Sequence, residues 1–418
     1  MAPVSQALDP DVSSGAWAVL RNRAFRRLWL AQAVSLVGDW FTLIALAVAV
    51  SRASGGSGLA VGGLLLTQLL PTAFVGPLGG ALADRFDRRR LLVQSDLLRA
   101  GIVLMLIPAL GAGTLFPLYA LAFLHFSVAT VFEPARSALV PRLVGPAQLV
   151  AATTLTSVTW SVMTALGGVL GGSILAAVGP RAAFVADALT FAASAALIGS
   201  MGPIPAAAEP AGEETGGPGV RDGLRYLRAH LVTAAVLAVK AIAGIGLVDT
   251  FLVIYGTRVF PRGEGGAISL GLLWACFGAG AVLGPSLLNF VNDGSVRRMR
   301  RLILAGIAMI VGGLGALALA PTLATAGFAV VLRGMGGSTN WTYSTVILQK
   351  VVPDALRGRV LALDLACLTL TATVGTLAWG WAIDVVGVRS VLLAAAAVCA
   401  VAGLAWAVLL SRMEQAEE

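Results

Sequence analysis

Twelve long apolar segments decide what this chain of 418 residues can fold into. They begin near Leu28, Leu59, Leu91, Leu115, Ala151, Ala182, Leu231, Ile268, Leu302, Leu323, Val360 and Val391. A run of about 20 apolar residues can cross a hydrocarbon core of about 30 Å as a helix, whereas a barrel strand alternates apolar and polar residues over roughly ten positions. Only 12% of the residues are charged and 58% are hydrophobic. The sequence therefore predicts an all-α membrane protein with twelve transmembrane helices.

The loops between these segments carry unequal numbers of basic residues. If the N-terminus is cytoplasmic, the loops on that side hold 21 of the 29 Lys and Arg residues, and five lie in the opposite loops. This asymmetry follows the positive-inside rule and predicts that both termini are cytoplasmic. The net charge of +8 is then a signal of topology, so we expect no nucleic-acid partner. Because Arg far outnumbers Lys, as in GC-rich bacterial genomes, we expect a bacterial plasma membrane.

The chain divides near its middle into two similar halves. Residues 201–230 are rich in Pro, Gly and Glu and end in a basic amphipathic stretch, DGLRYLRAHL, which predicts a cytoplasmic linker lying on the membrane surface. VGPR at 178–181 recurs as VGVR at 386–389, and LVGPAQL at 143–149 resembles VVPDAL at 351–356. We therefore expect a cytoplasmic segment 1–27, six-helix bundles over 28–200 and 231–411, and a cytoplasmic tail 412–418. Two such bundles, arranged as parallel repeats, describe one large class of transporters.

The densest cluster of charge follows the second apolar segment. The stretch GALADRFDRR, from Gly80 to Arg89, resembles the pattern G-x-L-A-D-R-x-G-R-R of the major facilitator superfamily, with Asp87 in place of Gly. DGLRYLRAH and VPDALRGRV are similar to the enterobactin-exporter and macrolide-efflux branch of that superfamily. The resemblance spans essentially the whole chain and implies a twelve-helix transporter of the major facilitator fold.

The resemblance also implies a gate at the cytoplasmic ends of the helices. By it, Asp84 would face the start of helix eleven, and Arg85 or Arg88 would pair with Glu133. A carboxylate can cap the positive N-terminus of a helix, and arginines beside it can pair with acids on neighbouring helices. The alternative is that these arginines only anchor the topology. The residues assigned to the gate are Gly80, Asp84, Arg85, Arg88, Arg89, Glu133, Arg136 and Arg357.

Ionisable residues interrupt the apolar segments, where each costs about 2.5–3.5 kcal/mol on the insertion scale. They are Asp39, Asp96, Arg99, Asp187, Lys240, Asp249, Arg333 and Asp364, with His125 beside them. Asp39, next to Trp40, lies twelve residues beyond Arg27, or roughly 18 Å along a helix. This depth is near the midplane, where transporters bind substrates and ions. Because desolvation favours a neutral carboxyl, Asp39 can take up a proton; alternatively, it can pair with a cationic drug.

Two pairs of charged residues share a segment. Asp96 and Arg99 lie on one helix face, so we expect either a structural ion pair or a pair that faces the cavity. Lys240 and Asp249 lie on opposite sides of their helix, so each needs a partner elsewhere.

The remaining buried polar residues leave several interpretations open. Arg333 can neutralise an acid or bind an anionic substrate, and His125 can relay protons or form a structural hydrogen bond. Asp187 and Asp364 lie nearer the interfaces, where we expect them to snorkel to water. Trp341 completes the residues assigned to the substrate cavity.

The chain lacks the sequence signatures of ATP hydrolysis and of metal binding. No GxxxxGK[ST] loop is present, and the two histidines and three cysteines show no ligand spacing. We therefore expect no cofactor or metal and a proton gradient as the energy source. The leading hypothesis is a monomeric secondary active exporter of a small, largely apolar molecule, such as a drug or natural product, by alternating access and proton antiport.

Two alternatives to this hypothesis remain. One is a siderophore or lysophospholipid carrier of the same fold. The other, an intramembrane enzyme, is remote because the chain has no GxSxG motif and no convincing His–Asp pair.

Overall fold

The computed structural model describes residues 18–75, 86–202, 220–246 and 248–417, and within these ranges the chain is helical, without strands. The first half contains a short 3-10 turn, η2 (Ala18–Arg21), and the helices α1 (Arg23–Ala53), α2 (Gly58–Phe74), α4 (Arg88–Ala109), α5 (Phe116–Leu143) and α6 (Pro146–Gly199). The side chain of Asn22 accepts hydrogen bonds from the first backbone N–H groups of α1, which otherwise lack a partner.

The second half begins with the amphipathic helix α7, whose basic residues were expected to lie on the membrane surface. Its elements are α7 (Val220–Ala229), α8 (Leu231–Ile245), α9 (Asp249–Ile254), the π-helical turn η3 (Tyr255–Val259), the 3-10 turn η4 (Glu264–Gly266), α10 (Ala267–Asn289), α11 (Val296–Ala318), α12 (Leu323–Val351), α13 (Asp354–Val386) and α14 (Val388–Glu417). The helix α7 packs against α13, and the hydroxyl of Tyr226 donates to the carbonyl of Val351 at 3.4 Å.

The long helix α6 crosses the membrane twice. Gly179, near its middle, has a φ of 77°, which a residue with a side chain rarely adopts, and Pro180 follows it. Proline is favoured in the first turn of a helix because the N–H that it lacks would have no partner there. The pair therefore ends one span and starts the next, so α6 is a helical hairpin within one continuous run of 54 residues.

All twelve predicted spans appear as helices. Among the described residues, nine helices are long and apolar enough to cross a membrane, with α8, α9 and η3 forming one broken segment. One of the nine, α6, supplies two spans. The shorter apolar helix α2 and the more polar α12 supply the other two.

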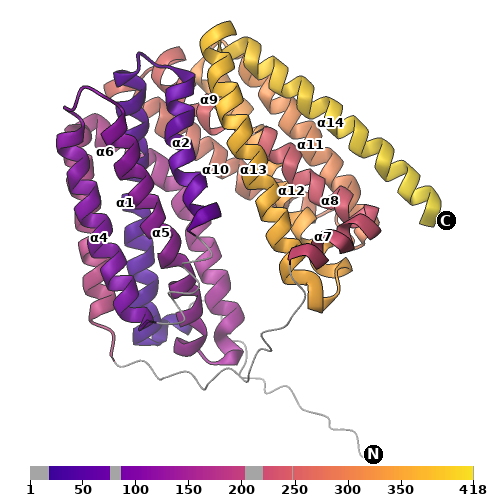
Figure 1. Ribbon diagram of the computed structural model, residues 1–418, viewed down its shortest axis with the longest axis horizontal. Helices are drawn as coiled ribbons and strands as arrows, with labels where there is room; N and C mark the ends of the chain where they lie inside the picture. The colour runs from indigo at the N-terminus through magenta and orange to yellow at the C-terminus, as the bar shows by residue number, and fades with distance from the viewer. Residues whose placement is uncertain (1–17, 76–85, 203–219, 247, 418) are drawn as a thin grey trace, which may run out of the picture.

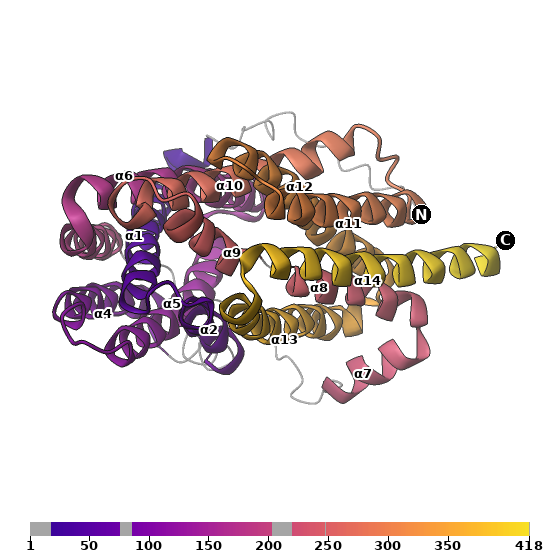
Figure 2. The same cartoon turned by 90° about the horizontal axis from the view of Figure 1, so that it is seen from above.

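The helices gather into two bundles, one from each half of the chain. The bundle of α1, α2, α4, α5 and α6 lies beside that of α8 to α14, and the two separate toward the end where α6 stops and α7 begins (Figures 1 and 2). We call this the linker end. At the opposite end, α2 lies against α13 and α6 lies against α10.

Small residues allow the two bundles to approach closely. A Cβ at Gly172 of α6 would lie 2.4 Å from the carbonyl oxygen of Ala267 in α10, and one at Gly58 would lie 2.6 Å from that of Gly380. Any side chain at these positions would push the bundles apart, because real contacts at such distances do not occur. The glycines in ALGGVLGG of α6 therefore serve helix packing.

Polar contacts tie the bundles together at the closed end, the region of residues 51–59, 257–264 and 384. Asp384, near the end of α13, accepts hydrogen bonds from the hydroxyl of Ser57 at 2.7 Å and the N–H groups of Gly58 and Leu59 at 2.7 and 3.1 Å. A carboxylate at this position caps the start of α2 and faces the positive end of its dipole. Arg52 and Glu264 form a second bridge at 3.0 Å.

Candidate substrate and ion site

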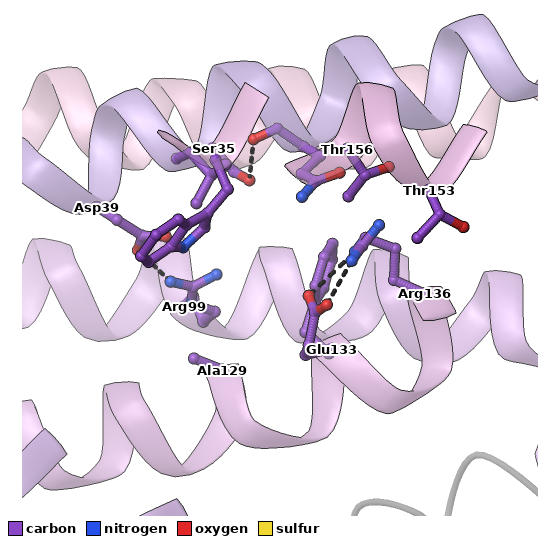
Figure 3. A pocket seen from close by; sticks show the side chains of 12 residues that line it. Ser35, Asp39, Arg99, Ala129, Glu133, Arg136, Thr153 and Thr156 are labelled. Atoms are coloured by element: carbon purple, nitrogen blue, oxygen red, sulfur yellow. Dashed lines mark hydrogen bonds and ion pairs between the residues drawn. The ribbon is translucent and has the colours of Figure 1, made fainter. Parts of the chain in front are cut away.

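A cavity of about 580 Å³ lies within the first bundle, and Figure 3 shows the side chains that line it. It is lined by Gln32, Ser35, Leu36, Asp39, Arg99, Ala129, Phe132, Glu133, Arg136, Thr153, Thr156 and Trp160. These residues come from α1, α4, α5 and the first span of α6. The lining combines one deep ion pair, Asp39 with Arg99, and one nearer the helix ends, Glu133 with Arg136, with apolar and hydroxyl side chains.

Asp39 and Arg99 form the deep ion pair of this cavity. The Arg99 side chain is only 4% exposed, whereas that of Asp39 is 30% exposed, so the carboxylate is the partner that cavity contents reach. Nε2 of His125, which is fully buried, lies 3.6 Å from the Asp39 carboxylate and 3.3 Å from the Arg99 guanidinium. The guanidinium also lies 4.1 Å from the ring centre of Phe191, where a cation–π contact replaces hydration.

The expected ion pair between Asp96 and Arg99 is replaced by two other contacts. Arg99 turns to Asp39 on α1, and Asp96 accepts a hydrogen bond of 2.6 Å from the hydroxyl of Ser194 on α6. Asp96 is fully buried, and its second oxygen, Oδ1, has no hydrogen-bond partner. The two side chains share a helix face, but their other neighbours decide their partners.

The expectation that Asp187 and Asp364 snorkel to water is wrong. Asp187 is 0% and Asp364 3% exposed, because both side chains point into the bundles rather than along the helices toward water. The carboxylate of Asp364 forms an ion pair of 2.6 Å with Lys240.

The Lys240–Asp364 pair lies apart from the cavity of the first bundle. The ammonium of Lys240 also donates to Thr345 at 3.2 Å and lies 4.0 Å from the ring centre of Trp341, whose other surface remains exposed. Lys240 thus finds its partner on α13, as its separation from Asp249 required. Of the residues assigned to one cavity, the structure brings Asp39, Arg99 and His125 together, with Asp96 behind them.

Arg333 is held at the break between α8 and α9. Its Nε and Nη2 both donate to the carbonyl of Gly246, at 3.1 and 2.7 Å, and the indole N–H of Trp379 donates to the carbonyl of Ile245 at 2.8 Å. The end of a helix leaves carbonyls without partners, and inside a membrane other side chains must satisfy them. Arg333 also attracts the carboxylate of Asp249 electrostatically. Nε and Nη2 are therefore bonded to the backbone, and the buried guanidinium holds the end of α8.

The residues assigned to the gate are only partly placed. Gly80, Asp84 and Arg85 lie outside the described residues. Glu133 pairs with Arg136, one turn further along α5, and Arg88 donates to the carbonyl of Ala138 at 2.9 Å. The expected bridge from Arg88 to Glu133 is therefore replaced by contacts of each residue with α5.

Two other gate residues contact backbone or local partners. Arg89 donates to the carbonyls of Ile198 and Gly199 at the end of α6, a favourable site for a cation beside the negative end of a helix dipole. Arg357 pairs with Asp354 within the first turn of α13.

Several polar partners of the site were not anticipated from the sequence. Ser194, Thr42 and Thr190 hydrogen-bond the buried carboxylates, but Ser and Thr are common in membrane helices and carry no spacing signal. Trp160 lines the cavity from an otherwise ordinary apolar span. Asp384 did carry a signal, because an acid at the end of an apolar segment is unusual.

A model of the transmembrane secretion effector family matches residues 14–418. The chain belongs to this family, within the major facilitator superfamily. The expectation of a transporter rather than an enzyme is therefore confirmed.

Related sequences include transporters and exporters. YfiS of Bacillus subtilis, an uncharacterized MFS-type transporter, is 28% identical over 43% of this chain and 43% of its own length, so the match spans less than half of that protein. The putative bacilysin exporter BacE of Bacillus amyloliquefaciens is 24% identical over 84% of this chain and 86% of its own length. Macrolide efflux protein A of Streptococcus pyogenes is 31% identical over 30% of this chain and 31% of its own length.

Solved structures share the fold. The nucleoside transporter NupG superposes with a TM-score of 0.75 at 11% identity, covering 92% of this chain and 98% of that structure. A bacterial homologue of the human lysosomal transporter Spinster, in an inward-facing and unoccupied conformation, superposes with a TM-score of 0.71 at 14% identity, covering 94% and 97%. At these identities the likeness concerns the fold alone, and it confirms the predicted major facilitator architecture.

Proposed function

We propose that this chain is a secondary active exporter of a small, largely apolar molecule, a drug or natural product, and that it exchanges this molecule for protons by alternating access. We place it in a bacterial plasma membrane with both termini in the cytoplasm. The observation that carries the proposal is a cavity whose deepest accessible group is the Asp39 carboxylate, in a molecule whose bundles are tied at the other end. The exporters named among its relatives support the direction of transport.

The chemistry of the cavity suits an exchange between a proton and a substrate. Asp39 is held by Arg99, so a proton on its carboxyl, or a cationic group beside it, weakens the ion pair and changes the electrostatic balance between α1 and α4. Leu36, Phe132 and Trp160 offer apolar surface to the rest of a substrate. Because few of the lining groups are polar, we propose selection by size and apolar character.

Transport by the purified protein in proteoliposomes tests the proposal. A panel of macrolides, peptide antibiotics, siderophores and lysophospholipids is offered with and without an imposed pH gradient. We expect gradient-dependent accumulation of apolar natural products. Accumulation of only siderophores or only lysophospholipids would favour the alternative carrier, and accumulation that ignores the gradient would reject proton coupling.

A further inference from the structure

Asp187, in the second span of α6, is a buried carboxyl group that the cavity does not expose. It is 0% exposed and forms no ion pair with the described residues. It lies against α1 at Gly38, where an added Cβ would be 2.1 Å from its Oδ1 atom. The charged groups that act on it are Asp39 on α1 and Arg99 on α4, and the same two residues also act on Asp96 of α4 and His125 of α5.

The hydrogen bonds of Asp187 bring no counter-charge to its carboxyl group, because both of its side-chain partners are neutral hydroxyls. Oγ1 of Thr190 lies 2.7 Å from the backbone carbonyl oxygen of Asp187 and 3.1 Å from its Oδ1. A hydroxyl has one hydrogen, so Thr190 shares it between these two acceptors, and the carboxyl oxygen receives the longer contact. Oδ1 therefore receives only a long hydrogen bond from a neutral group. The hydroxyl of Thr42 supplies the hydrogen for the other carboxyl oxygen, Oδ2.

The charge of the surrounding cluster favours a neutral carboxyl group at Asp187. Asp39, Asp96 and Asp187 face one guanidinium, that of Arg99, which is engaged by Asp39. With a neutral imidazole at His125, three ionised carboxylates would leave an excess of two negative charges away from water. An uncompensated buried charge is expensive, and such groups become neutral instead. Protons on Asp96 and Asp187, the two fully buried acids of the cluster without an ion-pair partner among the described residues, remove this excess.

We propose that Asp187 is a second proton-binding site, occupied by a proton in this conformation and connected to Asp39 through α1. Thr42, which hydrogen-bonds Asp187, lies one turn beyond Asp39, so a movement of α1 against α6 alters both carboxyl groups together. In the transfer, the proton leaves Oδ1 of Asp187, the O–H bonding electrons remain on the new carboxylate, and the Asp39 carboxylate accepts the proton. This role in the cycle rests on the proposed function, whereas the presence of the proton does not.

Infrared spectroscopy of the purified protein at about pH 7, where an ordinary Asp with a pKa of about 3.9 is ionised, tests the proton directly. We expect the carbonyl band of a protonated carboxylic acid, and we expect Asp187→Asn to remove that part of it. Asp364→Asn is the matched control, because Asp364 is an equally buried acid that pairs with Lys240 and contributes no such band. A spectrum of Asp187→Asn identical to that of the wild type in this region would overturn the proposal.

A second variant guards against a folding defect in Asp187→Asn. Thr190→Val keeps the acid but removes the hydroxyl that hydrogen-bonds Oδ1, so the band should shift to the frequency of a carboxylic acid with a weaker hydrogen bond. An unshifted band would show that the hydrogen lies elsewhere and would also overturn the proposal.

The role in the cycle is tested by transport. Asp187→Asn resembles the protonated acid but cannot release a proton, so we expect substrate exchange without a gradient to persist while gradient-driven accumulation falls at least tenfold. Unchanged accumulation would mean that the proton on Asp187 is only structural. Wild-type transport that ignores the pH gradient would instead reject the proposed function, and the infrared result would stand apart from it.

Discussion

The Asp39–Arg99 pair joins a reachable carboxylate to a cation that the protein keeps from water. Contents of the cavity can touch Asp39, whose side chain is 30% exposed, but Arg99 is covered by Phe191 and His125. Neutralising Asp39 therefore leaves the positive charge of Arg99 without a counter-ion in a poorly solvated place. The free-energy cost of this unpaired charge is larger than at a protein surface, because the local dielectric constant is lower.

Asp39→Asn is expected to preserve folding and to abolish proton-driven export, because the amide keeps the shape of the acid but cannot titrate. Accumulation in proteoliposomes under a pH gradient measures the loss, and substrate exchange without a gradient should remain. Asp222→Asn, which removes an acid at the surface of α7, serves as the control. Full gradient-driven accumulation in Asp39→Asn would shift the coupling role to Asp96 or Asp249.

The Lys240–Asp364 pair offers a test of stability at the same scale. Removing one partner of a buried pair leaves an uncompensated charge and typically costs about 3–5 kcal/mol, whereas replacing both by apolar residues is often neutral. We expect Lys240→Met to lower the thermal stability in detergent strongly and the double variant Lys240→Met, Asp364→Leu to restore it. If the single variant is as stable as the wild type, the ammonium is not the partner that keeps Asp364 ionised.

Among the elements, the seventh span depends most clearly on a side chain from another helix. Its first part, α8, ends at Ile245 and its second part, α9, begins at Asp249, and Arg333 and Trp379 bond the carbonyls of Gly246 and Ile245. The carbonyls at the end of α8 therefore depend on side chains of α12 and α13 for their hydrogen bonds.

Arg333→Leu is expected to destabilise the protein by about 1–3 kcal/mol, the cost of leaving a buried carbonyl without a donor. Arg333→Lys should recover part of this loss, because an ammonium can reach one carbonyl but lacks the two parallel donors of a guanidinium. Thermal unfolding in detergent provides the measurement, with the exposed Arg262→Leu as the control. Equal stability of Arg333→Leu and wild type would contradict the role of Arg333 at the break.

The Asp384 cap acts between elements of different bundles, so it exists only while the closed end is closed. An exposed carboxylate at a helix N-terminus contributes about 0.3–1 kcal/mol, which is roughly a two- to fivefold change in a two-state balance. Asp384→Asn should therefore shift molecules toward separation of α2 and α13 at this end. Spin labels at Leu59 and Val385, in a background without the native cysteines, would show more of the longer distances.

Asp293→Asn is the control for this shift, because Asp293 is an exposed acid in the loop before α11 whose carboxylate accepts a hydrogen bond from the backbone of the neighbouring Ser295. An identical distance distribution in Asp384→Asn and wild type would show that packing alone closes this end.

At the scale of the whole molecule, the distribution of basic residues and the arrangement of the helices make one joint prediction. Ser54 follows α1 at the closed end, and Ser295 precedes α11 at the linker end. Single cysteines at these positions should react with impermeant reagents from opposite sides of the membrane, Ser54 from outside and Ser295 from the cytoplasm. Labelling of both from one side would contradict the twelve-span topology.

The architecture was predictable from the sequence because lipid imposes one length and one pattern on every span. The partners of the buried charges were less predictable. Spacing correctly separated Lys240 from Asp249, but it suggested a pair between Asp96 and Arg99, whose actual partners come from α6 and α1. A charged side chain can pair with a residue close in sequence or with one that the fold brings near, and a single sequence does not show which partner it takes.

The sequence separation of the two deep ion pairs has a consequence for how the protein is made. Asp39 and Arg99 are 60 residues apart, whereas Lys240 precedes Asp364 by 124 residues. At about 5–20 residues per second, α8 waits on the order of 10 s for its partner helix to leave the ribosome. During that time Lys240 lacks its carboxylate partner, which makes the insertion of α8 into the bilayer less favourable by about 2.5–3.5 kcal/mol. We therefore expect the second bundle to complete its packing only after α13 has been inserted. A chain that stops after α12 would keep Lys240 as an uncompensated charge in the membrane.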